Sequence, residues 1–226
     1  MGIISTKGFQ YRGVPQDFIL MLIDENKATT FIETGTHWGG TAIWATGFFE
    51  KVITIEASEE IFNGNDFNKY NNLDACLGDS VAILPEKICD DSIFYLDAHF
   101  SGGNTFNAFP LIQELKIINS VILKNSTIII DDARYCMACW NDDSYGSLPE
   151  IISLMSNDKS RYVVIIDDMI IAAPLRYKEL VDKYTNIISK KYCIQFASDT
   201  TVKERKHTFM YRMRRKLYSV YKKLIT

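Results

Sequence analysis

The chain has 226 residues, of which 47% are hydrophobic and 23% are charged. This composition is ordinary for a globular protein, and it excludes wholesale disorder, collagen-like repeats and a small disulfide scaffold. No apolar run approaches the roughly 20 residues that a membrane-spanning helix needs. The opening residues also lack the apolar core of a secretory signal. We therefore expect one α/β domain with appendages, located in the cytoplasm.

The net charge of −3 hides an uneven distribution. Nine basic residues and one acid lie between residues 203 and 226, so this tail carries +8 and the rest of the chain −11. Apolar residues recur in the tail at helical spacing with cations between them. That pattern is typical of a helix on an anionic membrane surface or on an acidic partner. A helix packed on the chain's own acidic body is the alternative.

Short apolar runs alternate with helical patterns along the chain, after a first helical stretch at 17–23. The runs lie at 29–33, 52–56, 75–77, 93–96 and 127–130, and the later helices at roughly 40–49, 58–70, 80–88, 109–120 and 147–157. Because the runs lack polar alternation, they predict strands that are buried on both faces. Alternation with helices predicts a parallel sheet. Two further runs around Asp167-Asp168 indicate an antiparallel hairpin within 162–174.

Five cysteines, including the pair Cys136 and Cys139, are present in the chain. With three histidines in the whole sequence, no second pair stands at metal-ligand spacing. Reduced, structural thiols are the favoured interpretation in a cytosolic chain, and a redox or metal-binding pair is the alternative.

Acidic residues follow each predicted parallel strand, at the edge where open parallel sheets bind ligands. The first strand leads into a glycine-rich turn, ETGTHWGGT, and the later ones into Glu56, Asp79-Ser80, Asp97 and Asp131-Asp132. The spacing Gly35-x-x-x-Gly39-Gly40 departs from the dinucleotide pattern GxGxxG, which argues against a bound pyrophosphate. Glu56 is placed to accept hydrogen bonds from ribose hydroxyls and Asp79 from an adenine amino group. These residues predict an adenosine ligand without phosphates.

The turn ETGTHWGGT resembles motif I of the class I S-adenosylmethionine-dependent methyltransferases. VITIEAS, LGDS and IFYLDAH resemble the second, third and fourth motifs of that family, in order. The resemblance covers roughly residues 29–174 and implies a Rossmann-like, doubly wound α/β fold. Its seven-stranded, mostly parallel sheet would close with the antiparallel hairpin. We expect a helical extension over 1–28, a methyltransferase domain over 29–200 and the basic tail over 201–226. A Rossmann-like domain that binds another nucleotide is the alternative.

The resemblance implies S-adenosylmethionine as the cofactor. Its amino-acid part would face Gly35 and the backbone of 34–39, with Glu33 near its amino group. Glu56 would hold the ribose, while Asp79 and Ser80 would border the adenine. The full set of candidate cofactor-binding residues is Glu33, Thr34, Gly35, Thr36, Gly39, Thr41, Glu56, Asp79, Ser80 and Asp97.

Converging carboxylates at Asp97, Asp131 and Asp132 would repel one another unless a cation or protonation intervened. Hard oxygen ligands select ions such as Mg²⁺ or Mn²⁺. The layout resembles metal-dependent O-methyltransferases that act on catechols and sugars, which implies a metal at these three residues. Asp97 is also a candidate catalytic residue, and His99 is the candidate general base. In the alternative interpretation, Asp97 contacts acceptor or cofactor directly and Asp132 caps the following loop.

The segment YLDAHFSGG, with PLIQEL and IIIDDAR after it, resembles a bacterial subgroup found among glycan-modifying genes. It implies a sugar acceptor, for which His99, Phe100, Arg134 and Tyr135 are the candidate binding residues. Arginine could grip the phosphate of a nucleotide-sugar.

The leading hypothesis is therefore a sugar O-methyltransferase in the cytoplasm, with a peripheral membrane or glycan-assembly contact through the basic tail as an option. The alternatives are a methyltransferase of a catechol-like small molecule and a non-catalytic protein that binds nucleic acid or membrane. Nucleic acid is the disfavoured partner, because the cofactor-type residues look intact, and a homo-oligomer is left open.

Overall fold

The computed structural model describes residues 13–26, 28–98, 109–137, 146–157 and 159–190. The chain divides into two compact units. The larger unit, Gln10–Tyr184, contains a seven-stranded sheet in the order β3-β2-β1-β4-β5-β7-β6. In the other unit, the described residues 185–190 are helical.

The elements follow the alternation expected from the sequence. The strands are β1 (Thr30–Thr34), β2 (Lys51–Glu56), β3 (Leu73–Leu77), β4 (Ser92–Leu96), β5 (Thr127–Ile130), β6 (Arg161–Ile166) and β7 (Met169–Pro174). The helices are α1 (Gln16–Asn26), α2 (Gly40–Ala45), α3 (Glu59–Asn63), α4 (Ser80–Lys87), α5 (Leu111–Asn119), α6 (Ala133–Met137) and α7 (Leu148–Ser156), with 3₁₀ turns η1 (Phe67–Lys69) and η3 (Leu175–Tyr177).

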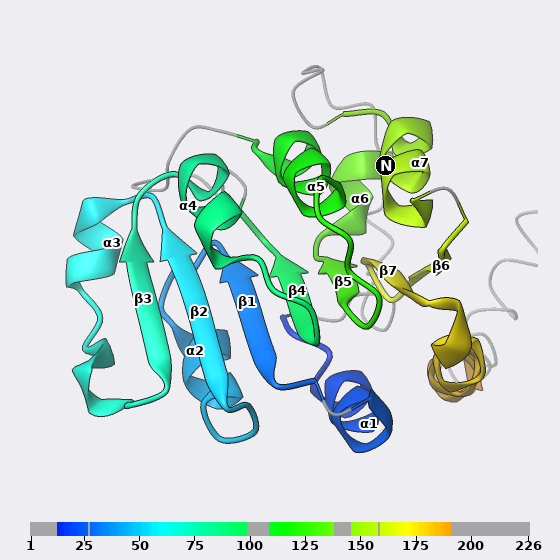
Figure 1. Cartoon of the computed structure of the whole chain (residues 1–226), viewed down its shortest axis with the longest axis horizontal. Coiled ribbons are helices and arrows are strands. Elements are labelled where there is room, and N and C mark those ends of the chain that lie inside the picture. The colour runs from blue at the N-terminus through cyan, green and yellow to red at the C-terminus, as the bar shows by residue number, and fades with distance from the viewer. Residues whose placement is uncertain (1–12, 27, 99–108, 138–145, 158, 191–226) are drawn as a thin grey trace, which may run out of the picture. The chain divides into compact units, whose positions relative to one another are not determined.

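Strands β1 to β5 are parallel, so their carboxyl ends meet at one edge, where the arrowheads of Figure 1 point. β1 lies in the middle of this group, with Thr34 beside Ile55 of β2 on one side and Leu96 of β4 on the other. The loops that follow β1, β2 and β4 therefore leave the sheet side by side. This arrangement confirms the predicted parallel sheet.

The predicted hairpin closes the sheet. β7 runs antiparallel to β5 and to β6, and the turn between β6 and β7 consists of Asp167 and Asp168. Both turn residues have positive φ, 53° and 66°. Two-residue turns of that hand suit the twist of antiparallel strands, and aspartate tolerates the left-handed region better than most residues.

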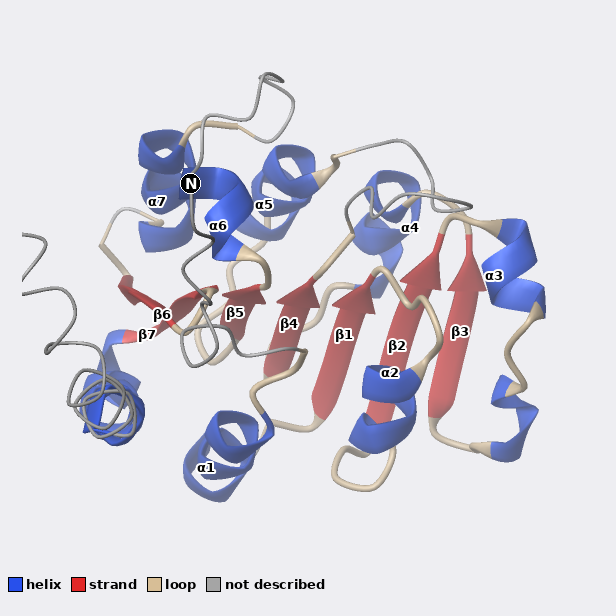
Figure 2. Cartoon of the chain, turned by 180° about the vertical axis from the view of Figure 1, so that it is seen from behind, coloured by secondary structure: helices blue, strands red, loops and turns tan. Residues whose placement is uncertain are grey.

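Helices cover both faces of the sheet. On one face, Leu84 of α4, Leu115 of α5 and Met155 of α7 belong to one buried cluster with strand residues such as Ile32 and Phe94. Phe31 points the other way and meets Trp44 of α2, with ring centroids 6.5 Å apart. Figure 2 shows α2 in front of the sheet from that side. Within the described ranges, no helix combines the length and apolar character needed to cross a bilayer.

Three expectations need correction. β3 is half-buried and Leu77 is 44% exposed, because β3 is an edge strand with a neighbour on one side only. The helix expected over 58–70 is split into α3, which ends at Asn63, and the turn η1. The short helix α6, which follows β5 directly, was not expected.

The described cysteines Cys76, Cys89 and Cys136 are free thiols. Burial of Cys136 raises its pKa to about 11, so it behaves as a packed, unreactive side chain. Cys139 lies outside the described residues, so the redox or metal alternative for the pair stays untested.

The packing of α5 on the sheet gives a stability prediction. Leu115 is fully buried in the cluster, so Leu115→Ala should lower the free energy of unfolding by about 2–5 kcal/mol through lost burial and a residual cavity. Urea unfolding at neutral pH measures this loss. Ile122→Ala is the matched control, because Ile122 is 85% exposed and should change stability by no more than about 0.5 kcal/mol. Equal effects of the two substitutions would contradict the packing.

Candidate functional site

The turn after β1 is pressed against the start of the loop after β4. Gly35 has φ +84°, and a Cβ at this position would lie 2.6 Å from the carbonyl oxygen of Asp97. The amide of Gly35 donates to Ile55 O at 2.9 Å, and the amide of Asp97 donates to Thr34 O at 3.0 Å. Only glycine fits this approach. Two predicted site residues, Gly35 and Asp97, are therefore brought together.

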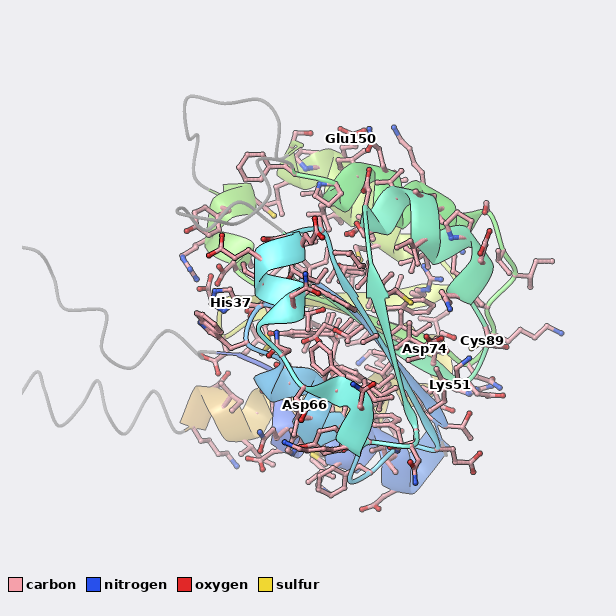
Figure 3. The ribbon with its side chains drawn as sticks, turned by 90° about the vertical axis from the view of Figure 1, so that its left-hand side faces the viewer. His37, Lys51, Asp66, Asp74, Cys89 and Glu150 are labelled. Carbon is pink, nitrogen blue, oxygen red and sulfur yellow. The ribbon has the colours of Figure 1, made fainter. Side chains whose placement is uncertain are left out.

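The same turn also contacts the segment that follows α3. Gly39, at φ +70°, would place a Cβ 2.8 Å from a ring carbon of Phe67, and His37 also has positive φ. Asn65 donates a side-chain hydrogen bond to His37 O at 2.8 Å, and Figure 3 shows His37 next to α3. The glycine-rich turn is therefore held on both sides before α2 begins at Gly40.

Glu56, at the end of β2, has its carboxylate oriented by two backbone amides. The amide of His37 donates to Oε2 at 2.9 Å and the amide of Ser58 to Oε1 at 2.8 Å. The residue is 6% exposed. Each carboxylate oxygen has a second lone pair, so Glu56 can still accept two hydroxyl hydrogen bonds.

Glu33 is buried, and its carboxyl group is linked by hydrogen bonds to the hydroxyl of Thr54 and, through it, to that of Thr36. Thr54 donates to Glu33 Oε2 at 2.6 Å, and the hydroxyls of Thr36 and Thr54 are 2.7 Å apart. Burial raises the pKa of Glu33 to about 8; the hydrogen bonds from Thr54 and Thr41 oppose this rise and nearby Asp97 adds to it. The carboxyl group is therefore largely protonated at neutral pH.

Asp79 and Ser80 lie at the start of α4. The Asp79 carboxylate accepts a hydrogen bond from the Val81 amide at 2.9 Å and so caps the helix, while Ser80 is buried. Capping of this kind stabilises a helix by about 1 kcal/mol. Asp79 thus has a structural partner besides the adenine amino group expected for it.

Asp131, at the end of β5, is a mostly buried acid. The hydroxyl of Tyr95 donates to its Oδ2 at 2.5 Å, and the amide of Asp132 donates to its Oδ1 at 2.8 Å. Burial, with the nearby charge of Asp97, raises its pKa to about 7. Both oxygens of this carboxyl group therefore already have protein donors.

Arg134 supplies the positive charge beside these acids. Its guanidinium donates to Asp132 Oδ1 at 2.5 Å and also to Asp168 in the hairpin turn. Asp168 further accepts hydrogen bonds from the amides of Ala133 and Arg134, at 2.7 and 2.8 Å. The β6–β7 turn therefore holds α6 in place. The Arg134 guanidinium also lies 4.8 Å from the centre of the Tyr135 ring.

Two of the three acids at the predicted metal site, Asp131 and Asp132, have protein partners, and the metal assignment at Asp97, Asp131 and Asp132 stays a prediction. Among the described residues, no three His, Cys, Asp or Glu side chains are grouped so as to hold an ion. Arg134 neutralises Asp132, and Tyr95 donates to Asp131. These contacts reduce the repulsion among the acids. The ion pairs with Asp132 and Asp168 also occupy the Arg134 guanidinium, which was expected to bind a substrate phosphate.

Two of the predicted residues, His99 and Phe100, lie outside the described residues, so the general-base and stacking assignments stay predictions. Sequence reasoning missed Thr54, Tyr95, Glu114 and Asp168. Thr54 and Glu114 carried a usable signal, because each is a polar residue at a position whose neighbours along a strand or helix face are apolar.

Comparison with known proteins supports the fold. No family model and no curated protein matches the sequence. A candidate O-methyltransferase from Klebsiella pneumoniae matches the structure with a TM-score of 0.53 and 13% identity over 73% of this chain and 82% of that one. A candidate caffeoyl-CoA O-methyltransferase from Staphylococcus aureus matches with a TM-score of 0.50 and 14% identity, over 73% and 86% of the two chains.

A candidate methyltransferase from Streptococcus mutans, solved with S-adenosylhomocysteine, matches with a TM-score of 0.50 and 11% identity, over 73% of this chain and all of that one. The chain therefore has the Rossmann-like fold found in these methyltransferase structures, with the parallel sheet and closing hairpin described above.

Glu33 makes stability depend on pH. Between pH 4.5 and about 8 the folded protein keeps a proton at Glu33 that the unfolded chain has released. Stability therefore falls as pH rises through this window, by at most about 1.4 kcal/mol per unit from this group. Glu33→Gln removes the effect, so its stability relative to the wild type should increase from pH 5 to pH 8. Urea unfolding across this range measures the difference.

The exposed Glu86→Gln is the control for this series, and it should track the wild type at every pH. A Glu33→Gln difference that stays constant with pH would show that Glu33 ionises as an exposed carboxyl group does.

Proposed function

We propose that the protein is an S-adenosylmethionine-dependent O-methyltransferase whose acceptor is a sugar hydroxyl, in a nucleotide-sugar or a surface polysaccharide. The observation that carries the cofactor assignment is Glu56, whose buried carboxylate is oriented by the amides of His37 and Ser58. Such a group can accept hydrogen bonds from both hydroxyls of a ribose. The fold shared with methyltransferase structures supports the same assignment.

The remaining site residues have compatible roles. The close approach of Gly35 to Asp97 brings two of the predicted cofactor-binding residues together at the end of β1. When bound, the cofactor would supply a methyl group on a positively charged sulfur, and the neutral thioether left behind is a good leaving group. The chain's task is to align the acceptor oxygen with that methyl group and to receive the hydroxyl proton. His99 is the predicted proton acceptor, and Asp97 lies two residues before it.

A phenolic acceptor is the second candidate. The Staphylococcus aureus neighbour is described as a caffeoyl-CoA O-methyltransferase candidate. Because the two chains are only 14% identical, that description applies to the neighbour and does not identify the acceptor of this chain. The membrane or glycan-assembly contact expected of the basic tail stays a prediction, because residues 191–226 lie outside the described part of the chain. The homo-oligomer also stays a prediction.

Cofactor binding tests the proposal directly. Calorimetric titration should show that the protein binds S-adenosylhomocysteine, and Glu56→Gln should weaken binding about 10–100-fold through loss of a charged acceptor. The control is Glu59→Gln, an exposed residue at the start of α3. Melting curves establish that both variants are folded. No binding to the wild type, with protection by NAD instead, would contradict the proposal.

A methyl-transfer screen, followed by mass spectrometry, tests the acceptor. Nucleotide-sugars and free sugars should gain one methyl group, catechols should not, and Asp97→Ala should abolish turnover. Because Arg134 already neutralises Asp132, we expect EDTA to change the rate by less than about twofold. A loss greater than tenfold that Mg²⁺ restores would show instead that the carboxylates regroup around a metal ion.

A further inference from the structure

A small hollow of about 10 Å³, which is room for about one water-sized group, lies where the ends of β4 and β5 meet the first turn of α5. Three of its lining residues carry carboxyl groups: Asp97, Glu114 and Asp131. The other lining residues are apolar, and none carries a positive charge. The chemistry of the hollow therefore favours a ligand group that donates hydrogen bonds or carries positive charge.

Glu114 is the most deeply buried of the three acids. It is 0% exposed, and neither carboxyl oxygen has a hydrogen-bond partner among the described residues. The hydroxyls of Ser80 and Thr34 lie near enough to lower its pKa, yet burial dominates and raises the pKa to about 7. The Thr34 hydroxyl is itself buried without a partner in the described part of the chain.

This position is costly for an acid that has only a structural role. Glu114 shares the buried face of α5 with Leu111, Leu115 and Ile118, and a leucine there would continue the apolar face. A buried polar group without a partner destabilises the folded state, whereas a ligand donor would satisfy it. Glu114 also connects the two ends of the proposed cofactor site, because Thr34 ends β1 and Ser80 begins α4.

We propose that the Glu114 carboxyl group binds an amino group that a ligand brings into this hollow. The inference rests on the proposed function and extends it, since it assigns a recognition role to a residue that no motif marks. Two sources of the amino group share this chemistry: the adenine of the cofactor, and an amino substituent on the acceptor. The two sources can be separated by ligands that differ only in the amino group.

Calorimetry on the full chain provides the test. One pair of probes is S-adenosylhomocysteine and S-inosylhomocysteine, in which oxygen replaces the adenine amino group. The second pair is glucosamine and glucose, titrated into protein saturated with S-adenosylhomocysteine. The wild type should prefer the amino-bearing member of at least one pair by about tenfold or more. Glu114→Gln and Glu114→Leu should lose that preference, while the exposed control Glu86→Gln should keep it.

Melting temperatures separate recognition from a structural role. Without ligand, Glu114→Leu should melt at or above the wild-type temperature, because it removes an unpartnered buried acid. If the adenine supplies the amino group, S-adenosylhomocysteine should raise the melting temperature of Glu114→Leu by less than it raises that of the wild type. Lower melting of both variants with an unchanged amino preference would overturn the inference, as would a wild type with no amino preference in either pair. Failure of the wild type to bind S-adenosylhomocysteine at all would instead contradict the proposed function.

Discussion

Carboxyl groups converge at one edge of a parallel sheet, and this convergence is the constraint on which the site depends. Parallel strands must end at the same edge, so the acids that follow β1, β2, β4 and β5 are brought together whatever their separation in the chain. Left ionised and unpaired, they would repel one another and oppose burial. The protein resolves this differently at each strand.

The Glu56 carboxylate is stabilised by two backbone amides, which are fixed dipoles that donate a hydrogen bond to each of its oxygens. Glu33 takes hydroxyl partners and a proton, since it is too deeply buried to ionise readily. Asp132 is neutralised by Arg134, which in turn depends on Asp168 in the closing hairpin. The antiparallel hairpin thus contributes to the site through one ion pair, besides completing the sheet.

Most of the fold could be predicted from the sequence. Strand β5 occupies 127–130 as expected, and the hairpin turns at Asp167-Asp168, because apolar runs and paired turn aspartates are local signals. Helix ends and the exposure of β3 were predicted less well. Those features depend on which strand lies at the edge and where a helix meets its neighbours, and neither is encoded within a short window of sequence.

The chain order of apolar runs, glycines and acids determined the sheet, the glycine-rich turn and the edge at which ligands would bind. The tertiary structure alone decided which acid has which partner. It packs Gly35 against Asp97, pairs Arg134 with Asp132 and Asp168, and buries Glu114 beside a hollow. The physical reason is that the charge state and hydrogen bonding of a carboxyl group depend on neighbours within a few ångströms, and folding draws those neighbours from distant parts of the chain.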